Sequence, residues 1–203
     1  QGDHYAFTLM TPEFSPSPTG LPRVPITFAA VGPAMIKLAG KICDGVRLPL
    51  FATRKYLEQI ALPLLDEGLA AGGRKRSEFE IWGGGFIATG HDEEAVAQQI
   101  EMIRYRLAFY GSTRSYHTVF AVHGWEDLGM KLHTMSKQGR WKEMAKEVPD
   151  DVVHTFAAVA THENLFAAVE KRFGGLVDSV TLEFDNATEI SERRDIIQDI
   201  RRI

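Results

Sequence analysis

Residues 25–50 read PITFAAVGPAMIKLAGKICDGVRLPL, and this stretch decides how the rest of the chain is interpreted. Residues 26–31 are apolar or β-branched throughout, as expected of a strand that is buried on both faces. Gly32-Pro33 ends that strand, and Pro33 suits the first turn of a helix, where its missing N–H costs nothing. Apolar residues then recur at helical spacing up to Ile42, and residues 46–50 predict a second strand. Because the loops are very short, we expect a βαβ unit with parallel strands and a right-handed crossover.

Composition places few limits on function but excludes several classes. A chain of 203 residues with a hydrophobic share of 44% can build one ordinary domain with a core. The net charge of −4 and the pI near 6.0 give no reason to expect nucleic acid or a membrane surface as partner. The single cysteine, Cys43, excludes an internal disulfide, fits a reducing cytoplasm and is interpreted as a small buried hydrophobe. No apolar run approaches the roughly 20 residues of a membrane span, and no signal peptide is visible.

The first half of the chain alternates between strand and helix patterns. A leader with a short strand at residues 5–9 and a proline-rich loop precedes the βαβ unit. After it, Thr53 is a plausible N-cap of a second helix, in which Pro63 should kink the axis or loosen one turn. Residues 79–89 predict a third strand that is interrupted by Gly83-Gly84-Gly85. A helix is expected to begin at residues 91–94, where acidic side chains interact favourably with the partial positive charge of the helix N-terminus.

In the second half, the alternation of strand and helix patterns stops over residues 112–151 and then resumes. Short helices are expected near residues 125–136 and 141–148, and residues 156–159 approach the core. Thr161 is a candidate cap for a helix that ends at Gly174-Gly175. Residues 180–184 predict the last strand and residues 190–203 a final helix.

The junction between the first strand and the first helix is the strongest candidate for a binding site. Ala30, Val31 and Gly32 place free backbone N–H groups at the start of a helix, which is a geometry that binds anions and phosphate in particular. Gly32 has no side chain and so allows close approach. A tight structural turn is the competing interpretation, and the local residues alone favour it.

Other residues with chemical potential have simpler interpretations. The triple glycine lies inside a strand pattern, so a bulge or a close approach by a ring or backbone is expected rather than a phosphate loop. The seven histidines form no metal-binding pattern, and no metal site is predicted. His123, beside Gly124-Trp125, is expected to be a loop histidine satisfied by local hydrogen bonds. Asp44 is expected to cap a turn. The arginines at 193, 194, 201 and 202 are expected to form a solvated face, although an arginine at a barrel mouth could bind a polyanionic cofactor tail.

The βαβ stretch also carries a family resemblance. A strand ending in AAVGP, an amphipathic helix, the CDGV turn and a second strand resemble the middle of luciferase-like monooxygenases, above all the oxidoreductases that use the deazaflavin coenzyme F420. Residues 2–12 resemble the segment before the fifth strand of that family, and residues 109–141, with their His-Gly-Trp motif, resemble an insertion typical of the group. The resemblance covers nearly the whole chain and includes no single catalytic signature.

The resemblance implies an α/β fold that forms part of a TIM (β/α)8 barrel. Residues 1–203 would be one partial domain holding strands five to eight, the C-terminal half, with a helical insertion at residues 112–151 before the last βα unit. A complete barrel typically needs about 250 residues. The implied activity is that of an oxidoreductase or monooxygenase in which F420, or alternatively FMN, binds at the C-terminal ends of the strands and carries the hydride. Its phosphate would be held at Ala30, Val31 and Gly32, with Phe51 and Thr53 as a second wall. The substrate would be a small molecule of open class, and the catalytic residues are unknown.

Two other readings remain open. Four strands cannot close an eight-stranded barrel, so the chain could be a half-barrel without activity of its own. Its outer strands would expose unpaired edges, and it would then assemble as a homo-oligomer or with a missing N-terminal half. A small α/β binding module is the third reading, and it requires a sheet whose edges are covered.

Overall fold

The protein is described by a computed structural model that covers residues 2–9, 11–15, 17–184 and 188–201. Its first sheet contains three parallel strands in chain order, β1 (Thr27–Ala29), β2 (Gly45–Arg47) and β3 (Glu80–Trp82). Phe28, Val46 and Ile81 lie side by side across this sheet. The predicted βαβ unit is therefore present, and its two strands are parallel. Both are shorter than expected: they cover residues 27–29 and 45–47, and after these ranges only Ala30 N and Leu48 N continue the pairing, to Arg47 O and Trp82 O.

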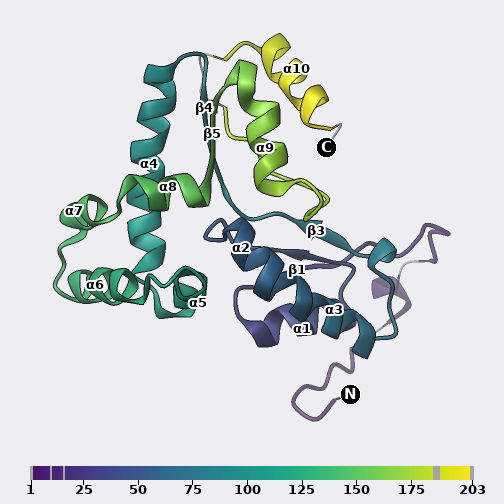
Figure 1. The fold of residues 1–203 in the computed structure, drawn as a ribbon. Coiled ribbons are helices and arrows are strands. Elements are labelled where there is room, and N and C mark those ends of the chain that lie inside the picture. Colours follow the sequence, from purple (N-terminus) through teal and green to yellow (C-terminus); the bar gives the residue numbers. More distant parts are fainter. Residues whose placement is uncertain (1, 10, 16, 185–187, 202–203) are drawn as a thin grey trace.

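Two helices pack against one face of this sheet (Figure 1). They are α1 (Pro33–Ile42) and α3 (Leu62–Ala71), which continue the chain after β1 and β2. Their backbones touch at Gly68, where a Cβ atom would lie only 2.2 Å from the carbonyl oxygen of Lys37. Val46 and Ile81 are fully buried in the core beneath them. Burial of this apolar layer is the main driving force for the βαβ unit.

The helix that leads from β2 into α3 contains the irregularity expected from Pro63. It starts as α2 (Arg54–Tyr56), widens into a π-helical turn at Leu57–Ala61 and continues as α3. Pro63 lacks the N–H that an α-helical turn would need at this point, which accounts for the loosened turn.

A second sheet is formed by two parallel strands, β4 (Phe86–Gly90) and β5 (Ala157–Thr161). Helix α4 (Glu93–Gly111) lies along one side of this pair and α9 (Leu165–Phe173) along the other (Figure 1). The single interrupted strand predicted at residues 79–89 is therefore two strands that belong to different sheets. The break lies at the triple glycine, because a Cβ atom on Gly84 would lie 1.6 Å from the carbonyl oxygen of Pro49. The close approach of two backbones therefore explains Gly84. This was one of the two interpretations of the triple glycine, the other being a bulge.

Short helices connect α4 to β5 and form a lobe beside the two sheets (Figure 1). The helices predicted near residues 125–136 and 141–148 are present as α6 and α7. Strand β5 was not predicted. The four helices are α5 (His117–Ala121), α6 (Glu126–Lys137), α7 (Trp141–Met144) and α8 (Asp150–Phe156).

Several expectations at the ends of the chain are not met. Residues 5–9 form no strand, and Tyr5 and Phe7 are exposed. Thr161 makes no capping hydrogen bond; its hydroxyl accepts a 3.4 Å bond from the side chain of Asn164. Residues 180–184 form no strand, although the preceding Ser179 makes an isolated parallel bridge to Trp82. The final helix is α10 (Ile190–Ile200), and the predicted positions 202 and 203 lie outside the described residues.

Membrane-spanning helices and metal-binding clusters are both missing from the described part of the chain. None of its helices has the length and apolar character needed to cross a membrane. No group of three or more His, Cys, Asp or Glu side chains among these residues is placed to hold a metal ion.

Candidate functional site

The loop between β1 and α1 has the geometry predicted for an anion site. Gly32 is the N-cap residue of α1, and its carbonyl oxygen accepts hydrogen bonds from Met35 N and Ile36 N. No hydrogen-bond acceptor is found among the described residues for the N–H groups of Val31 and Gly32. Both residues are half-buried, whereas Ala30 is buried and donates its N–H to Arg47 O. A Cβ atom added at Gly32 would meet nothing within 4 Å, so the space above this loop is open.

Tyr56 ties this loop to the start of the next helix. Its hydroxyl donates to Val31 O at 3.3 Å, and its backbone N–H donates to Thr53 Oγ1 at 3.1 Å. Thr53 is therefore the N-cap that the sequence predicted. Burial raises the pKa of Tyr56, which keeps its hydroxyl neutral and able to donate. Tyr56 itself was not predicted as part of the site.

His123 reaches the same place from the helical lobe. Its Nε2 lies 2.8 Å from Thr53 Oγ1, and its ring stacks on Trp125 with 4.4 Å between centroids and 14° between planes. The prediction of a histidine satisfied by local partners is thus wrong in one respect, because Thr53 lies 70 residues away in sequence. Burial, followed by the positive charges of Lys55 and Arg172, lowers the pKa of His123. The imidazole is accordingly held in its neutral form at the junction of the lobe with the first sheet.

The second wall differs from the one expected, because neither of its predicted side chains reaches the surface. Phe51 and Thr53 both have 0% exposure. The Phe51 ring lies 4.5 Å from Phe156 and 5.1 Å from Phe120, centroid to centroid. Phe51 therefore anchors the loop after β2 in the core, and Thr53 acts through its hydroxyl contacts.

A buried arginine that was not predicted as part of the site binds the backbone of the loop after β2. Arg172, on α9, is 6% exposed. Its Nη2 donates to Ala52 O at 2.5 Å and its Nε to Phe156 O at 3.4 Å, while the guanidinium lies 4.7 Å from the Phe173 ring centre. Burial, together with the nearby charge of Arg54, lowers its pKa to about 10. No sequence signal distinguished it from the arginines that were considered.

Asp44 has a structural role at the other end of β1. Its Oδ2 accepts the N–H of Ile26 at 2.7 Å, and its Oδ1 pairs with Arg23 at 2.5 Å. The hydrogen bond from Arg23, followed by that from Ile26, lowers the pKa of Asp44 to about 2. Asp44 is thus not catalytic in this geometry: it fastens the start of β1 instead of capping the turn into β2.

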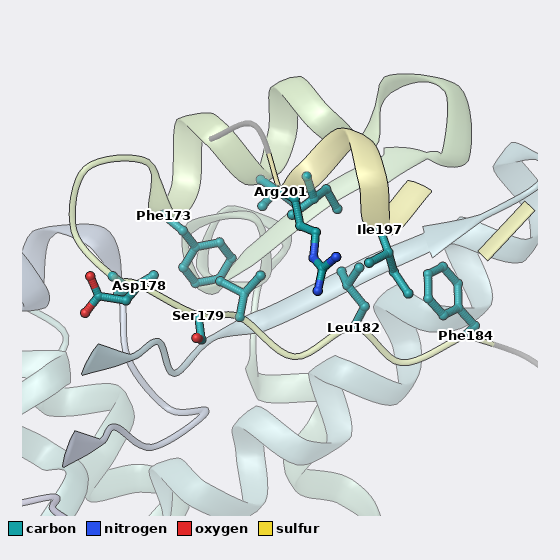
Figure 2. A pocket seen from close by; sticks show the side chains of 11 residues that line it. Phe173, Asp178, Ser179, Leu182, Phe184, Ile197 and Arg201 are labelled. Carbon is teal, nitrogen blue, oxygen red and sulfur yellow. The ribbon is translucent and has the colours of Figure 1, made fainter. Parts of the chain in front are cut away.

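A cavity among the described residues lies elsewhere. It has a volume of about 540 Å³ and is lined by residues of α9 and α10 and by residues 177–184. Figure 2 shows Leu182, Phe184 and Ile197 around it, with the guanidinium of Arg201 directed inward. None of the five residues predicted to bind the cofactor lines this cavity.

Comparison with known proteins identifies the family to which this arrangement belongs. The family described as luciferase-like monooxygenase matches residues 1–179. The chain belongs to the luciferase-like monooxygenase family. The uncharacterized protein Rv1360 of Mycobacterium tuberculosis is 36% identical over 202 residues, which are 100% of this chain and 59% of that protein. The chain thus spans less than two thirds of the length of this relative.

Two solved structures show a similar fold. The first is the coenzyme F420-dependent tetrahydromethanopterin reductase of Methanopyrus kandleri, with a TM-score of 0.63 and 24% identity over 77% of this chain and 44% of that one. The second is an F420-dependent secondary alcohol dehydrogenase in complex with an F420-acetone adduct. Its TM-score is 0.63, with 18% identity over 99% of this chain and 55% of that one. The luciferase-like chain therefore has an α/β fold similar to F420-dependent enzymes.

Proposed function

We propose that the chain is the cofactor-binding part of an oxidoreductase that uses coenzyme F420, with FMN as the alternative, and acts on a small-molecule substrate. The phosphate of the cofactor is held by the N–H groups of Val31 and Gly32 at the N-terminus of α1. The observation that carries this proposal is that these two N–H groups have no acceptor among the described residues. Family membership and F420 dependence of the two similar structures support the choice of cofactor.

The residues present fit a phosphate. Helix α1 is 10 residues long, so its N-terminus carries a partial positive charge. The open space above Gly32 leaves room for phosphate oxygens, and Pro33 stands at the first helical position, where an N–H would have no partner within the helix. The bound group would supply the hydride chemistry. The protein's own contribution is to fix the loop, through the hydrogen bond from Tyr56 to Val31 O, before a ligand arrives.

His123 has a positioning role in this proposal. It is neutral, half-buried and fixed by Thr53 and Trp125. It therefore adds no positive charge beside the loop, and it orients the Thr53 hydroxyl that caps the helix containing Tyr56. The roles of acid, base and hydride donor or acceptor are not assigned to residues of this chain.

Titration of F420 and FMN into the full chain, followed by fluorescence, tests the proposal. We expect both ligands to bind, F420 more tightly, with inorganic phosphate as a competitor. Gly32→Ala adds a methyl group where the phosphate approaches and should weaken binding at least tenfold, equivalent to about 1.4 kcal/mol. Gly2→Ala is the matched control and should leave affinity unchanged. Equal affinity of Gly32→Ala and the unaltered chain, or no binding of either cofactor, would refute the proposal.

The alternative is a half-barrel that is inactive alone. It is favoured by one observation, the absence of a ladder at residues 180–184 in the described structure. Turnover assays with reduced F420 and candidate carbonyl substrates distinguish the two, because a binding-competent but incomplete chain would bind cofactor without turnover.

A further inference from the structure

The hydroxyl of Thr53 determines which nitrogen of His123 carries a hydrogen atom. Thr53 Oγ1 accepts a hydrogen bond from Tyr56 N at 3.1 Å and lies 2.8 Å from His123 Nε2. A hydroxyl has one hydrogen atom to donate, and Thr53 has 0% exposure, so this atom needs an acceptor inside the protein. Among the described residues, the acceptor within reach is His123 Nε2. Thr53 therefore donates to Nε2, and the hydrogen atom of the neutral imidazole lies on Nδ1.

The opposite assignment leaves a buried group without a partner. If His123 Nε2 donated to Thr53 Oγ1, the hydroxyl hydrogen of Thr53 would point at no acceptor in the described structure. An unpaired buried donor makes this arrangement roughly tenfold less populated, or rarer still. The imidazole with its hydrogen atom on Nδ1 is consequently the form that the fold selects.

The Nδ1–H group of His123 is a rigid donor that the described structure does not use. Nδ1 has no hydrogen-bond partner among the described residues, and it is not one of their side-chain atoms that are both unpaired and shut off from solvent. A ligand can therefore reach it. The ring is held in place because it stacks on Trp125, 4.4 Å between centroids, and bonds to Thr53. Such a preorganised donor loses little conformational entropy when it binds.

The charges around His123 favour an anionic partner. Lys55 and Arg172 are the charged groups that, after burial, lower the pKa of His123, and no carboxylate contributes. Lys55 is exposed and takes part in no ion pair of the described structure. The buried Arg172 bonds only to the neutral carbonyl oxygens of Ala52 and Phe156, and its Nη1 has no partner among the described residues. The positive charge at this place is thus not balanced by an acid of the described chain.

His123 lies next to the phosphate loop and is joined to it through one residue. Tyr56 donates its N–H to Thr53 Oγ1 and its hydroxyl to Val31 O at 3.3 Å. The group that fixes the loop therefore also fixes the partner of His123. A small molecule that binds beside the cofactor can place one polar group at His123 and Lys55.

We propose that His123 and Lys55 bind an anionic oxygen group of the substrate, a carboxylate or a phosphate. The Nδ1–H of His123 donates to one oxygen of this group, and the ammonium group of Lys55 supplies the opposite charge. The inference rests on the proposed function, because it names the substrate class of the same oxidoreductase as an organic acid or a phosphate ester. The donors differ from the N–H groups of Val31 and Gly32, which hold the phosphate of the cofactor. No bond is made or broken at His123, whose role is to bind and orient.

The position of the hydrogen atom on His123 is tested without any ligand. Long-range ¹H–¹⁵N correlation spectra of the full chain distinguish a protonated from an unprotonated ring nitrogen, and His123→Gln identifies the signals of His123. We expect a protonated Nδ1 and an unprotonated Nε2 at neutral pH. A hydrogen atom on Nε2 instead would overturn the proposal, because Nδ1 would then have none to donate.

Anion binding is tested by adding sodium phosphate, sodium acetate or uncharged acetone to the full chain and to Gly32→Ala, at constant ionic strength. We expect phosphate or acetate, and not acetone, to shift the Nδ1 signal of His123 with the same affinity in both proteins. The phosphate and acetate arms distinguish the two kinds of anionic group. No shift with either anion, or a shift that Gly32→Ala abolishes, would overturn the separate site. If neither F420 nor FMN binds while the anion shift remains, the proposed function fails and the anion site stands.

Lys55→Gln tests the second group of the site. Lys55 is exposed, so the variant should fold like the unaltered chain. We expect it to weaken the affinity for the anion about fivefold, the scale of an exposed charge pair. Lys142→Gln, at an exposed lysine of the helical lobe, is the matched control and should leave the affinity unchanged. Equal affinities of Lys55→Gln and Lys142→Gln would contradict the proposed pair of binding groups.

Discussion

The hydroxyl of Thr53 is the contact on which the candidate site depends most directly. Thr53→Val keeps the size of the side chain and removes the oxygen. Two bonds are lost, the 3.1 Å cap from Tyr56 N and the 2.8 Å contact with His123 Nε2. Thr53 has no exposed surface, so water cannot replace the oxygen at this position.

The expected cost follows from these two bonds. Loss of an N-cap costs about 1 kcal/mol. Loss of the bond to His123 costs roughly 0.5–1.5 kcal/mol, with the lower values more appropriate because His123 is half-buried and water can reach part of its ring. Together the free energy of unfolding should fall by about 2 kcal/mol. Thr53→Ser keeps the oxygen and loses one methyl group, which costs about 0.8 kcal/mol.

Urea denaturation of the purified chain measures both values, and a double-mutant cycle isolates the bond to His123. His123→Phe keeps a ring that can stack on Trp125 and removes the nitrogen. In that background Thr53→Val should cost about 0.5–1 kcal/mol less than in the unaltered chain. The reasoning is refuted if the two backgrounds give the same cost within about 0.3 kcal/mol and Thr53→Val is no more destabilising than Thr53→Ser.

Three further predictions concern the supports of the site. Arg172→Leu leaves two buried carbonyl oxygens without donors and should cost about 2–4 kcal/mol by urea denaturation, while Arg106→Leu at an exposed ion pair should change stability by less than about 1 kcal/mol. Gly84→Ala places a methyl group against a backbone oxygen and should prevent soluble expression, whereas Gly32→Ala, with open space, should express and melt like the unaltered chain. The lowered pKa of His123 means that the folded state resists protonation, so stability should fall as pH drops below the unfolded pKa of about 6.5 toward the folded value. His123→Gln should flatten the stability profile in that window, and an unchanged slope would show that other groups cause it.

The first βαβ unit could be predicted because its signals are local. An apolar run, a Gly-Pro stop, helical spacing and an Asp-Gly turn lie within residues 25–50, and each acts through its immediate neighbours. Strand β5 could not be predicted in the same way. Its sequence AAVAT suits a helix as well as a strand, and only pairing with β4, about 70 residues earlier, makes it a strand. The division of residues 79–89 between two sheets likewise depends on the distant backbone of Pro49.

Part of the candidate site could be predicted from the sequence for the same reason, because its signals are local. Val31, Gly32 and Thr53 follow from local rules for helix starts. Tyr56, His123 and Arg172 do not, because each makes a hydrogen bond to a residue that is 25, 70 or 120 positions away, respectively. The His-Gly-Trp motif marked His123 as unusual, but no rule connected it with Thr53.

The amino-acid sequence by itself determined the parallel unit at residues 25–50, the burial of Cys43 and the membership of the luciferase-like family, since these depend on short-range pattern and on likeness along the chain. The tertiary structure alone decided that His123 of the helical lobe bonds to Thr53 beside the first sheet, and that residues 79–89 divide between two sheets. Those features depend on contacts between residues that are far apart in the sequence. The free energy of such contacts is a property of the whole packed chain and not of a single segment.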